Sequence, residues 1–440
     1  MPDGLAYSQI IKNIKKEKYM KSLSYCRWIS TEFLFMISIM SSVLFGAYAL
    51  PIQFTNNLGN TQLAILSGTF FAVFAFSQLY SGYLINKIST KFLLGVSAAL
   101  AAGGVFIFAN THVFGLLIVA RVIIGLGLGC TFVGVLYIVE LEFSRQFAFF
   151  ASLSQSVGNV AAGVIAIFGS SLISGYSYQA AYNLIGILLL IAAGFIFVFL
   201  PNKPQNSNEQ SDSSLFKNLK TILLNKRFIA ATIYFGGIFA TVLAYADLFN
   251  IKYREVIFQM SAQKAIILNG MIPLGIAIGG VIAGSLSSKY KRNRLIAAGF
   301  SLISLLAMII TLYVRFPTED AYTISTAIQL LFGIGCGGGM LAFQEVQVAF
   351  KDVSLRPMAN SCILTISYLF AGLILQPGIG MIIGNNLYKL PRNTVATAHN
   401  LLDQPIIQQA WHHYNLGLSI LVVILAASFI SSLFFTAKID

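Results

Sequence analysis

The sequence predicts an all-α membrane protein with twelve transmembrane helices arranged as two six-helix pseudo-repeats. Three observations support this prediction: an apolar composition, twelve apolar runs long enough to cross a bilayer, and glycine and basic motifs that recur in both halves of the chain. Of the 440 residues, 57% are hydrophobic and only 10% are charged, and the mean hydropathy is +0.79. Soluble domains carry about 25% charged residues, so this composition places most of the chain in lipid.

The positive charge of the chain does not indicate a nucleic-acid partner. The formal net charge is +13, but the basic residues lie between apolar runs, whereas nucleic-acid-binding domains cluster them on one polar face. The four cysteines, Cys26, Cys130, Cys336 and Cys362, are too widely spaced for a disulfide framework or a metal cluster. The sequence therefore predicts no nucleic-acid partner, no metal site and no cofactor.

Each predicted span is an apolar run of about 20 residues, the length that crosses a hydrocarbon core of about 30 Å. The twelve runs are residues 28–51, 62–85, 92–109, 114–138, 147–172, 178–200, 228–250, 264–287, 295–314, 322–347, 358–385 and 413–436. The polar stretch that begins PNKPQNSNEQSDSS separates the first six from the last six.

The division of the chain follows from these runs. We expect a basic N-terminal segment (1–27), a six-helix N-terminal half (28–200), a linker (201–227) and a six-helix C-terminal half (228–440). The first segment is polar and basic for longer than a cleaved signal peptide, so it is expected to be retained.

The distribution of lysine and arginine predicts the orientation. With the N-terminus inside, the inner segments carry 21 of the 28 basic residues and the outer loops, which include Arg254, carry 6. Cytoplasmic loops retain positive charge, so both termini are predicted to lie in the cytoplasm, with the chain in the inner cell membrane. All four histidines, His112, His399, His412 and His413, fall on the outer side, and whether they sense an acidic exterior stays open.

Two sequence motifs occur once in each half. The loop GYLINKISTK after the second span matches GSLSSKYKRN after the eighth, which pairs Gly82 with Gly284 at an offset of 202 residues. The run RVIIGLGLGC in the fourth span matches QLLFGIGCGG in the tenth, which pairs Arg121 with Gln329 at an offset of 208 residues. Two motifs at nearly one offset indicate a duplicated six-helix unit, the parallel repeat of one class of secondary transporter.

These motifs resemble those of the major facilitator superfamily over essentially the whole chain. The first loop is similar to the signature loop of that family, with matches at Gly82, Leu84, Lys87 and Lys91, while Asn86 stands where the family has an acid. The resemblance implies alternating access between two halves, with a latch formed by this loop. The Gly-Pro motif that antiporters carry in the fifth helix is missing from SVGNVAAGVIAIFG, which disfavours exchange and efflux.

A narrower resemblance is to the phagosomal nutrient transporters of intracellular bacteria. The stretches FGAYALPIQF, LSGTFFAVFAFSQLYSGYL and IYFGGIFATVLAYADLF carry this resemblance. It implies import of an amino acid, nucleoside or vitamin-like nutrient. Ile39 stands where that group carries a glutamate, and Asp247 stands where that group usually has an apolar residue. The substrates of that group are therefore not assigned to this protein.

Charged and polar residues inside the spans are the candidates for the transport site. An ionisable group in the bilayer needs a partner or a water-filled cavity, so Arg121 and Asp247 are the first candidates for substrate binding or coupling, and they are placed to meet across the cleft. The uncharged candidates are Tyr234, Tyr245, Gln329, Gln155 and Asn159. The candidate gating residues are Gly82, Asn86, Lys87, Lys91, Gly284, Lys289 and Arg292. Glu32, Glu140, Glu142 and Glu345 lie near predicted span ends, where solvated positions are expected.

The glycines spaced four apart, such as Gly333 and Gly337, predict close helix packing, because they lack the strand and Lys-Ser or Lys-Thr of a phosphate loop. The sequence thus predicts a secondary transporter and no enzyme. We expect a monomer that moves a small polar organic solute, by proton-coupled import. An exporter or a passive uniporter on the same fold, and a non-transporting membrane receptor, remain alternatives.

Overall fold

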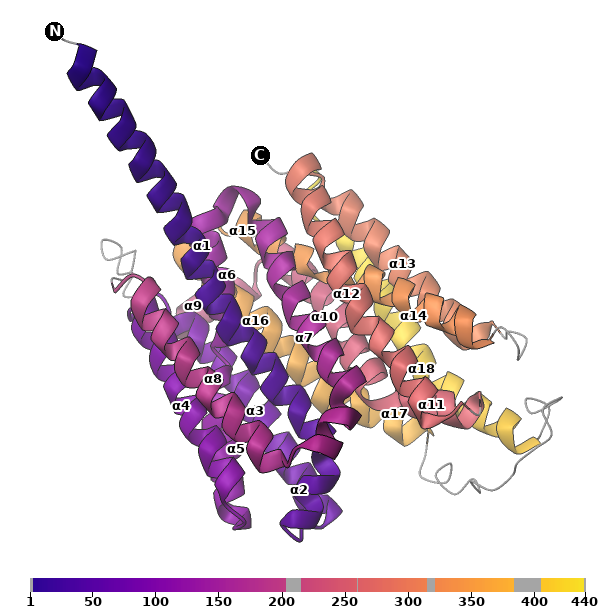
Figure 1. Cartoon of the computed structure of the whole chain (residues 1–440). Coiled ribbons are helices and arrows are strands. Elements are labelled where there is room, and N and C mark those ends of the chain that lie inside the picture. The colour runs from indigo at the N-terminus through magenta and orange to yellow at the C-terminus, as the bar shows by residue number, and fades with distance from the viewer. Residues whose placement is uncertain (1–2, 203–214, 259, 315–320, 384–404, 439–440) are drawn as a thin grey trace.

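The computed structural model describes residues 3–202, 215–258, 260–314, 321–383 and 405–438. Long helices cross the molecule and are joined by short connections (Figure 1). The helices of the first half and the linker are α1 (Asp3–Ala47), α2 (Ala49–Thr55), α3 (Asn60–Leu84), α4 (Thr90–Asn110), α5 (Phe114–Leu128), α6 (Thr131–Phe143), α7 (Phe147–Gly175), α8 (Tyr178–Phe199) and α9 (Leu215–Leu223). Those of the second half are α10 (Lys226–Ala244), α11 (Asn250–Ile257), α12 (Ala262–Tyr290), α13 (Asn293–Tyr313), α14 (Ala321–Gly337), α15 (Leu341–Ala349), α16 (Arg356–Leu369), α17 (Gln376–Ile383) and α18 (Pro405–Ser432).

The twelve predicted crossings are present in the described part of the chain. It contains 11 apolar segments long enough to span a bilayer, one of which, Phe114–Ile165, is 52 residues long. That segment crosses twice, because the chain turns at Ser144–Gln146 between α6 and α7. The fold class predicted from the sequence is confirmed.

Several helix boundaries differ from the prediction. The first helix begins at Asp3, so the basic N-terminal segment continues the first span as one long helix (Figure 1). The same helix ends at Ala47, and Pro51 lies in the separate short helix α2. A proline is tolerated in the first turn of a helix, where its missing N–H needs no partner.

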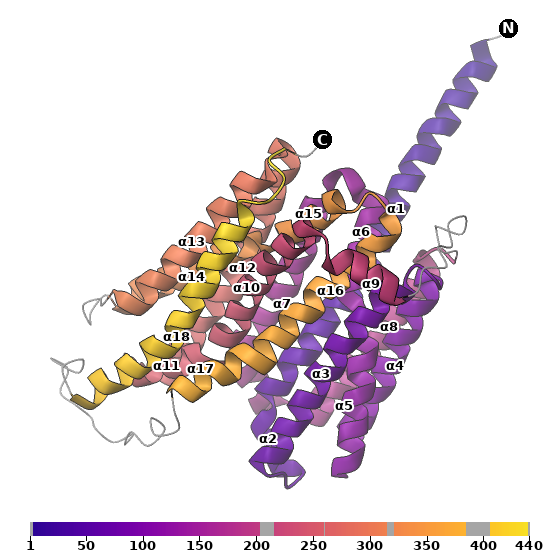
Figure 2. The same cartoon turned by 180° about the vertical axis from the view of Figure 1, so that it is seen from behind.

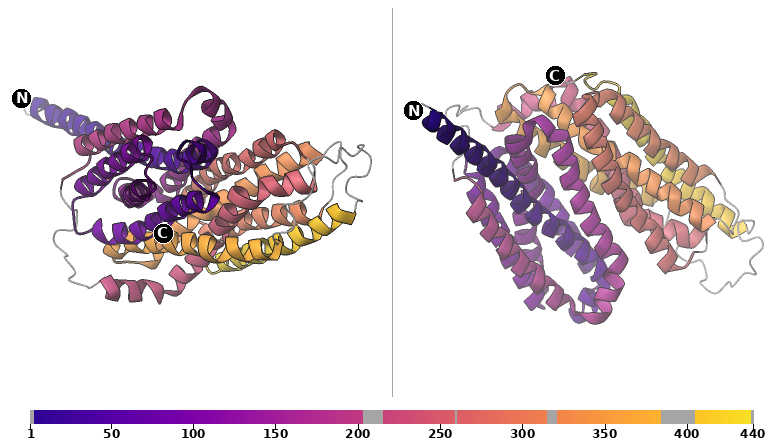
Figure 3. Two further views of the ribbon diagram at one scale, coloured as in Figure 1. Left: turned by 90° about the horizontal axis from the view of Figure 1, so that it is seen from below. Right: turned by 45° about the horizontal axis from the view of Figure 1, so that its top comes forward.

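The two six-helix groups lie side by side, with the N-terminal half in indigo to magenta and the C-terminal half in salmon to yellow (Figures 2 and 3). We call residues 28–200 the N-half and residues 228–440 the C-half. Glycines allow close packing within the C-half: a Cβ on Gly333 of α14 would lie 2.9 Å from the Cα of Gly275 on α12. The packing role expected for these glycines is therefore confirmed, since real Cβ atoms do not approach so closely.

Two extensive helix pairs join the halves, α3 with α16 and α7 with α12, and α6 and α7 also contact α16 and α15 at the same junction. We call the end of the bundle at which both chain ends and α9 lie the terminal end, and the end at which α2 and α11 lie the distal end (Figure 1). Between described residues, the hydrogen bonds, ion pairs and ring contacts that join the halves lie from the terminal end to about the middle of these helices.

Candidate functional site

The predicted loop motif forms a contact between the halves at the terminal end. A Cβ on Gly82 would lie 2.6 Å from the Pro357 carbonyl oxygen and 2.7 Å from the Ser361 Cβ, so only glycine allows α3 to approach α16 this closely. One turn later, the Asn86 side-chain amide donates a hydrogen bond to the Ser354 carbonyl oxygen. The neutral Asn86 therefore joins the halves through a hydrogen bond in place of the acid of the family motif.

An ion pair that the sequence did not predict lies beside this contact. The Arg356 guanidinium at the start of α16 donates to the Glu140 carboxylate of α6 at 2.9 Å, and Gln347 donates to the same carboxylate at 3.5 Å. The Arg356 and Glu140 side chains are 20% and 10% exposed, respectively. Glu140 is thus no solvated loop acid, and its pair with Arg356 connects the N-half to the C-half.

Glu345 has the corresponding place in the second half, since it follows Glu140 by 205 residues, close to the repeat offset. It is 0% exposed and accepts hydrogen bonds from the Thr436 backbone N–H at 2.9 Å and from the Asn293 amide at 3.3 Å. The solvated positions expected for Glu345 and for Glu32, which is 7% exposed, are both wrong. Glu345 therefore makes its hydrogen bonds within the C-half, whereas Glu140 of the N-half binds Arg356 of the C-half.

The second contact between the halves runs along α7 and α12. The Ser156 hydroxyl donates to the Ala277 carbonyl oxygen at 2.7 Å, and a Cβ on Gly284 would lie 2.6 Å from the Ala148 carbonyl oxygen. Gly82 and Gly284, which the repeat pairs, therefore each allow one of the two close contacts between the halves. The predicted gating residues Lys87, Lys289 and Arg292 are exposed, and Lys91 is half-buried.

A continuous chain of aromatic rings crosses from one half to the other. Its two steps between the halves are Phe132 to Phe343, with ring centroids 6.0 Å apart, and Phe74 to Tyr368, with centroids 5.5 Å apart. Successive rings in this aromatic belt are Phe35, Phe132, Phe343, Phe235, Phe239, Tyr368, Phe74 and Phe70. The belt therefore connects the two halves through ring contacts at two places.

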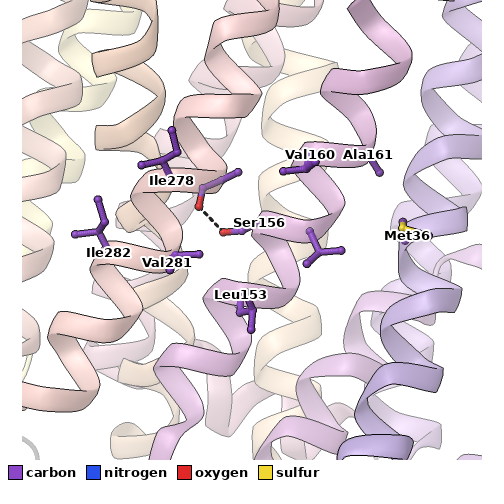
Figure 4. Close-up of a pocket in the computed structure, with 10 residues that line it drawn as sticks. Met36, Leu153, Ser156, Val160, Ala161, Ile278, Val281 and Ile282 are labelled. Carbon is purple, nitrogen blue, oxygen red and sulfur yellow. Dashed lines mark hydrogen bonds between the residues drawn. The ribbon is translucent and has the colours of Figure 1, made fainter. Parts of the chain in front are cut away.

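A lateral pocket of about 610 Å³ lies along the same α7–α12 contact (Figure 4). Ser156 is the polar residue of its lining, and its hydroxyl is bonded to Ala277. The other lining residues are Met36, Leu153, Val157, Val160, Ala161, Ala277, Ile278, Val281 and Ile282. A polar solute finds no free hydrogen-bonding group there, so we do not place the transport site in this pocket.

Arg121 lies inside the N-half. It is 1% exposed, and its Nε donates to the Leu66 carbonyl oxygen at 3.0 Å. The guanidinium carbon lies 4.2 Å from the ring centroid of Phe45 and 4.5 Å from that of Phe70, and cation–π attraction of this kind partly compensates a buried cation. The side chain is not paired with Asp247, although its Nη1 has no hydrogen-bond partner.

A second buried arginine lies in the C-half, where the sequence predicted an outer loop. Arg254 is 1% exposed and donates to Asn250 at 3.2 Å, to Ser325 at 3.3 Å and to the Tyr245 hydroxyl at 3.2 Å. Gln329, which the repeat pairs with Arg121, lies in the same cluster and donates to Thr311 at 3.2 Å. Tyr245 and Gln329 are therefore brought together around Arg254.

Replacing Arg254 by glutamine is expected to destabilise the C-half. The shorter amide leaves buried oxygens of this cluster without a donor, at a cost of about 1–3 kcal/mol for each. We expect a lower thermal unfolding midpoint for the purified protein, and no change for Arg227→Gln, which removes an exposed guanidinium. An unchanged midpoint in Arg254→Gln would contradict a bracing role for Arg254.

Three other candidates make contacts within one half. The Tyr234 hydroxyl, 0% exposed, donates to the Gly338 carbonyl oxygen at 3.0 Å and so connects α10 to the end of α14. The Asn159 amide donates to the Gln155 carbonyl oxygen one turn earlier on α7, and both side chains are half-buried.

Asp247 lies in a π-helical turn, Tyr245–Phe249, that follows α10. Such turns leave backbone carbonyls without their usual partners and are frequent at functional sites. Two side chains bind carbonyl oxygens here: Gln376 donates to Leu243, in the last turn of α10, at 3.1 Å, and Asn269 donates to Ala246, in the π-helical turn, at 2.9 Å. Asp247 itself is exposed, although it lies within the membrane-spanning segment Lys226–Ile257.

Comparison with known proteins identifies the family. Residues 33–387 match the family model described as Major Facilitator Superfamily. The chain belongs to the major facilitator superfamily. It is 25% identical over 311 residues to an uncharacterized transporter of Buchnera aphidicola subsp. Schizaphis graminum, covering 69% of this chain and 73% of that protein.

Further relatives agree with this assignment. A putative glycerol-3-phosphate transporter 1 of Arabidopsis thaliana is 21% identical over 291 residues, covering 57% of this chain and 55% of that protein. Among solved structures, the MFS transporter FucP in the outward conformation superposes with a TM-score of 0.71 at 17% identity, over 92% of this chain and 98% of that one. A variant of the E. coli fucose:proton symporter FucP gives a TM-score of 0.70 at 17% identity, with the same coverage.

Membership of this superfamily settles the class of the protein. It is a multi-pass membrane protein and a secondary transporter of small-molecule solutes, and it is no enzyme. The likeness to FucP establishes the fold.

Proposed function

We propose that this superfamily member imports a small polar organic solute by alternating access, coupled to protons, and that the structure is its outward-facing state. The terminal end is assigned to the cytoplasm because 21 of the 28 basic residues lie in segments predicted there. The amino acids, nucleosides and vitamin-like nutrients moved by the phagosomal transporters are the first solutes to test.

The observation that carries the proposal is the distribution of contacts between the halves. On the terminal side, the Gly82 contact, the Glu140–Arg356 pair and the aromatic belt join the two halves. On the distal side of the belt, Asp247 is exposed within the membrane-spanning segment Lys226–Ile257. A charge in such a segment needs a partner or a water-filled cavity, and we infer that the water around Asp247 is continuous with the outside.

Uptake into liposomes tests this function. Purified protein is reconstituted, and labelled amino acids, nucleosides and vitamins are supplied with and without an inward proton gradient. Uphill accumulation of a solute that depends on the gradient is the expected result. Equilibration that ignores the gradient would favour the passive uniporter, and no uptake by folded protein would contradict import.

Arg121→Ala is expected to abolish accumulation while folded protein remains in the membrane. The substitution removes the cation that binds Leu66 and contacts Phe70, the last ring of the aromatic belt, so it disturbs the N-half where the belt ends. The measurement is uptake in the same liposomes, normalised to the protein that elutes as a folded species. Uptake at the wild-type rate would remove Arg121 from the mechanism.

A further inference from the structure

We propose that the transported solute carries a positively charged amine and that Asp247 is its counter-charge. This inference rests on the proposed transport function and names the substrate class of the same cavity. Three features support it: the way the backbone presents Asp247, the partners that the ion-paired and buried arginines bind elsewhere, and the aromatic rings beside Asp247.

The position of Asp247 is built by its neighbours. The π-helical turn Tyr245–Phe249 interrupts the regular hydrogen bonding of the seventh crossing, and Gln376 and Asn269 bind carbonyl oxygens of this region from two other helices. These side chains fix the backbone immediately before Asp247. The carboxylate is held by a supported turn and is exposed on the distal side of the belt.

No cation of the protein neutralises this carboxylate among the residues that the structure describes. The two ion pairs found there are Arg27 with Glu142 and Arg356 with Glu140. The two buried arginines are engaged elsewhere, Arg121 with Leu66 and Arg254 with Asn250, Ser325 and Tyr245. An acid at membrane depth without a protein partner is most stable when a ligand brings the opposite charge.

The surroundings of Asp247 also suit a cation. Tyr368 lies within electrostatic range of the Asp247 carboxylate, and its ring contacts Phe239 at 4.9 Å and Phe74 at 5.5 Å between centroids. The faces of aromatic rings attract cations and disfavour anions. An acid beside a wall of rings therefore selects an amine with an apolar or aromatic body over a carboxylate or a neutral isostere.

Thermal unfolding of the purified full-length protein tests this selection without requiring transport. The probes are 2-phenylethylamine, its neutral isostere 2-phenylethanol and the anion 3-phenylpropionate, each titrated to millimolar concentration. We expect the amine alone to raise the unfolding midpoint. In Asp247→Asn the amine concentration for a half-maximal shift should rise at least tenfold, and Asp247→Glu should retain part of the effect.

The matched control is Glu255→Gln, which removes the same charge from α11, two turns beyond Asp247. The amine should stabilise this variant as it does the wild type. Equal stabilisation by the alcohol, no stabilisation by the amine, or an unchanged response in Asp247→Asn would each overturn the proposal. Uptake of a neutral or anionic solute by wild-type liposomes would overturn it as well, while leaving the proposed transport function intact.

Discussion

Gly82→Leu is expected to deplete the proposed outward-facing state. The new side chain would occupy the position of the Ser361 side chain and the Pro357 carbonyl oxygen, so α3 and α16 can no longer touch. Overpacking of a tight contact costs about 1–3 kcal/mol for a few added methylenes. Because each 1.4 kcal/mol changes a population ratio tenfold, the shift should be about fivefold to a hundredfold.

The distance between the terminal ends of the two halves reports this shift. Spin labels are placed on cysteines that replace the exposed residues Arg145 in the N-half and Tyr290 in the C-half, after the four native cysteines have been replaced by serine. Pulsed electron resonance should show one short distance in the parent protein and a longer one in Gly82→Leu. Uptake should be lost together with the short distance.

Gly103→Leu is the matched control, because Gly103 is exposed on α4 and a Cβ there meets nothing within 4 Å. The distance distribution and uptake of this variant should equal those of the parent. If Gly82→Leu also keeps the short distance, then the close approach at Gly82 is not required for closure of the terminal end.

The twelve crossings could be predicted because length and hydropathy are properties of each local segment. The exact course of the seventh crossing could not be predicted, because the apolar run ends near Asn250 while the helix continues to Ile257. Arg254 reads as a loop residue in sequence, but its helix directs it to Ser325, 71 residues away. Such a partner has no local signature, so the buried arginine of the C-half was missed.

The contacts between the halves could be predicted only in part, for a related reason. The duplicated loops marked Gly82 and Gly284, and both lie at the two tightest places of contact. Glu140 and Arg356 are 216 residues apart, and nothing in either neighbourhood indicates the other. The repeat offset that joins Glu140 to Glu345 was the available signal, because an acid at the same point of both halves indicates a structural position rather than a loop.

Glu140→Gln is expected to weaken closure of the terminal end without disturbing the fold. Glutamine keeps the shape of the side chain but removes the charge that binds Arg356, and a hydrogen bond to a charged group is worth about 1.5–3 kcal/mol. The ratio of closed to open terminal ends should fall about tenfold to a hundredfold. The same pair of spin labels measures it as growth of the longer distance.

Glu142→Gln separates this effect from a general loss of charge. Glu142 lies half a turn further on α6 and forms its ion pair with Arg27 of α1, which makes no link to the C-half, and the exposures of the two pairs are nearly equal. Its loss should leave the distance distribution unchanged. Arg356→Gln should reproduce Glu140→Gln, and the double variant should add little, because residues of one pair are not additive. Full additivity would instead mean that Glu140 and Arg356 act on the terminal end independently, and that the ion pair is not what holds the halves together.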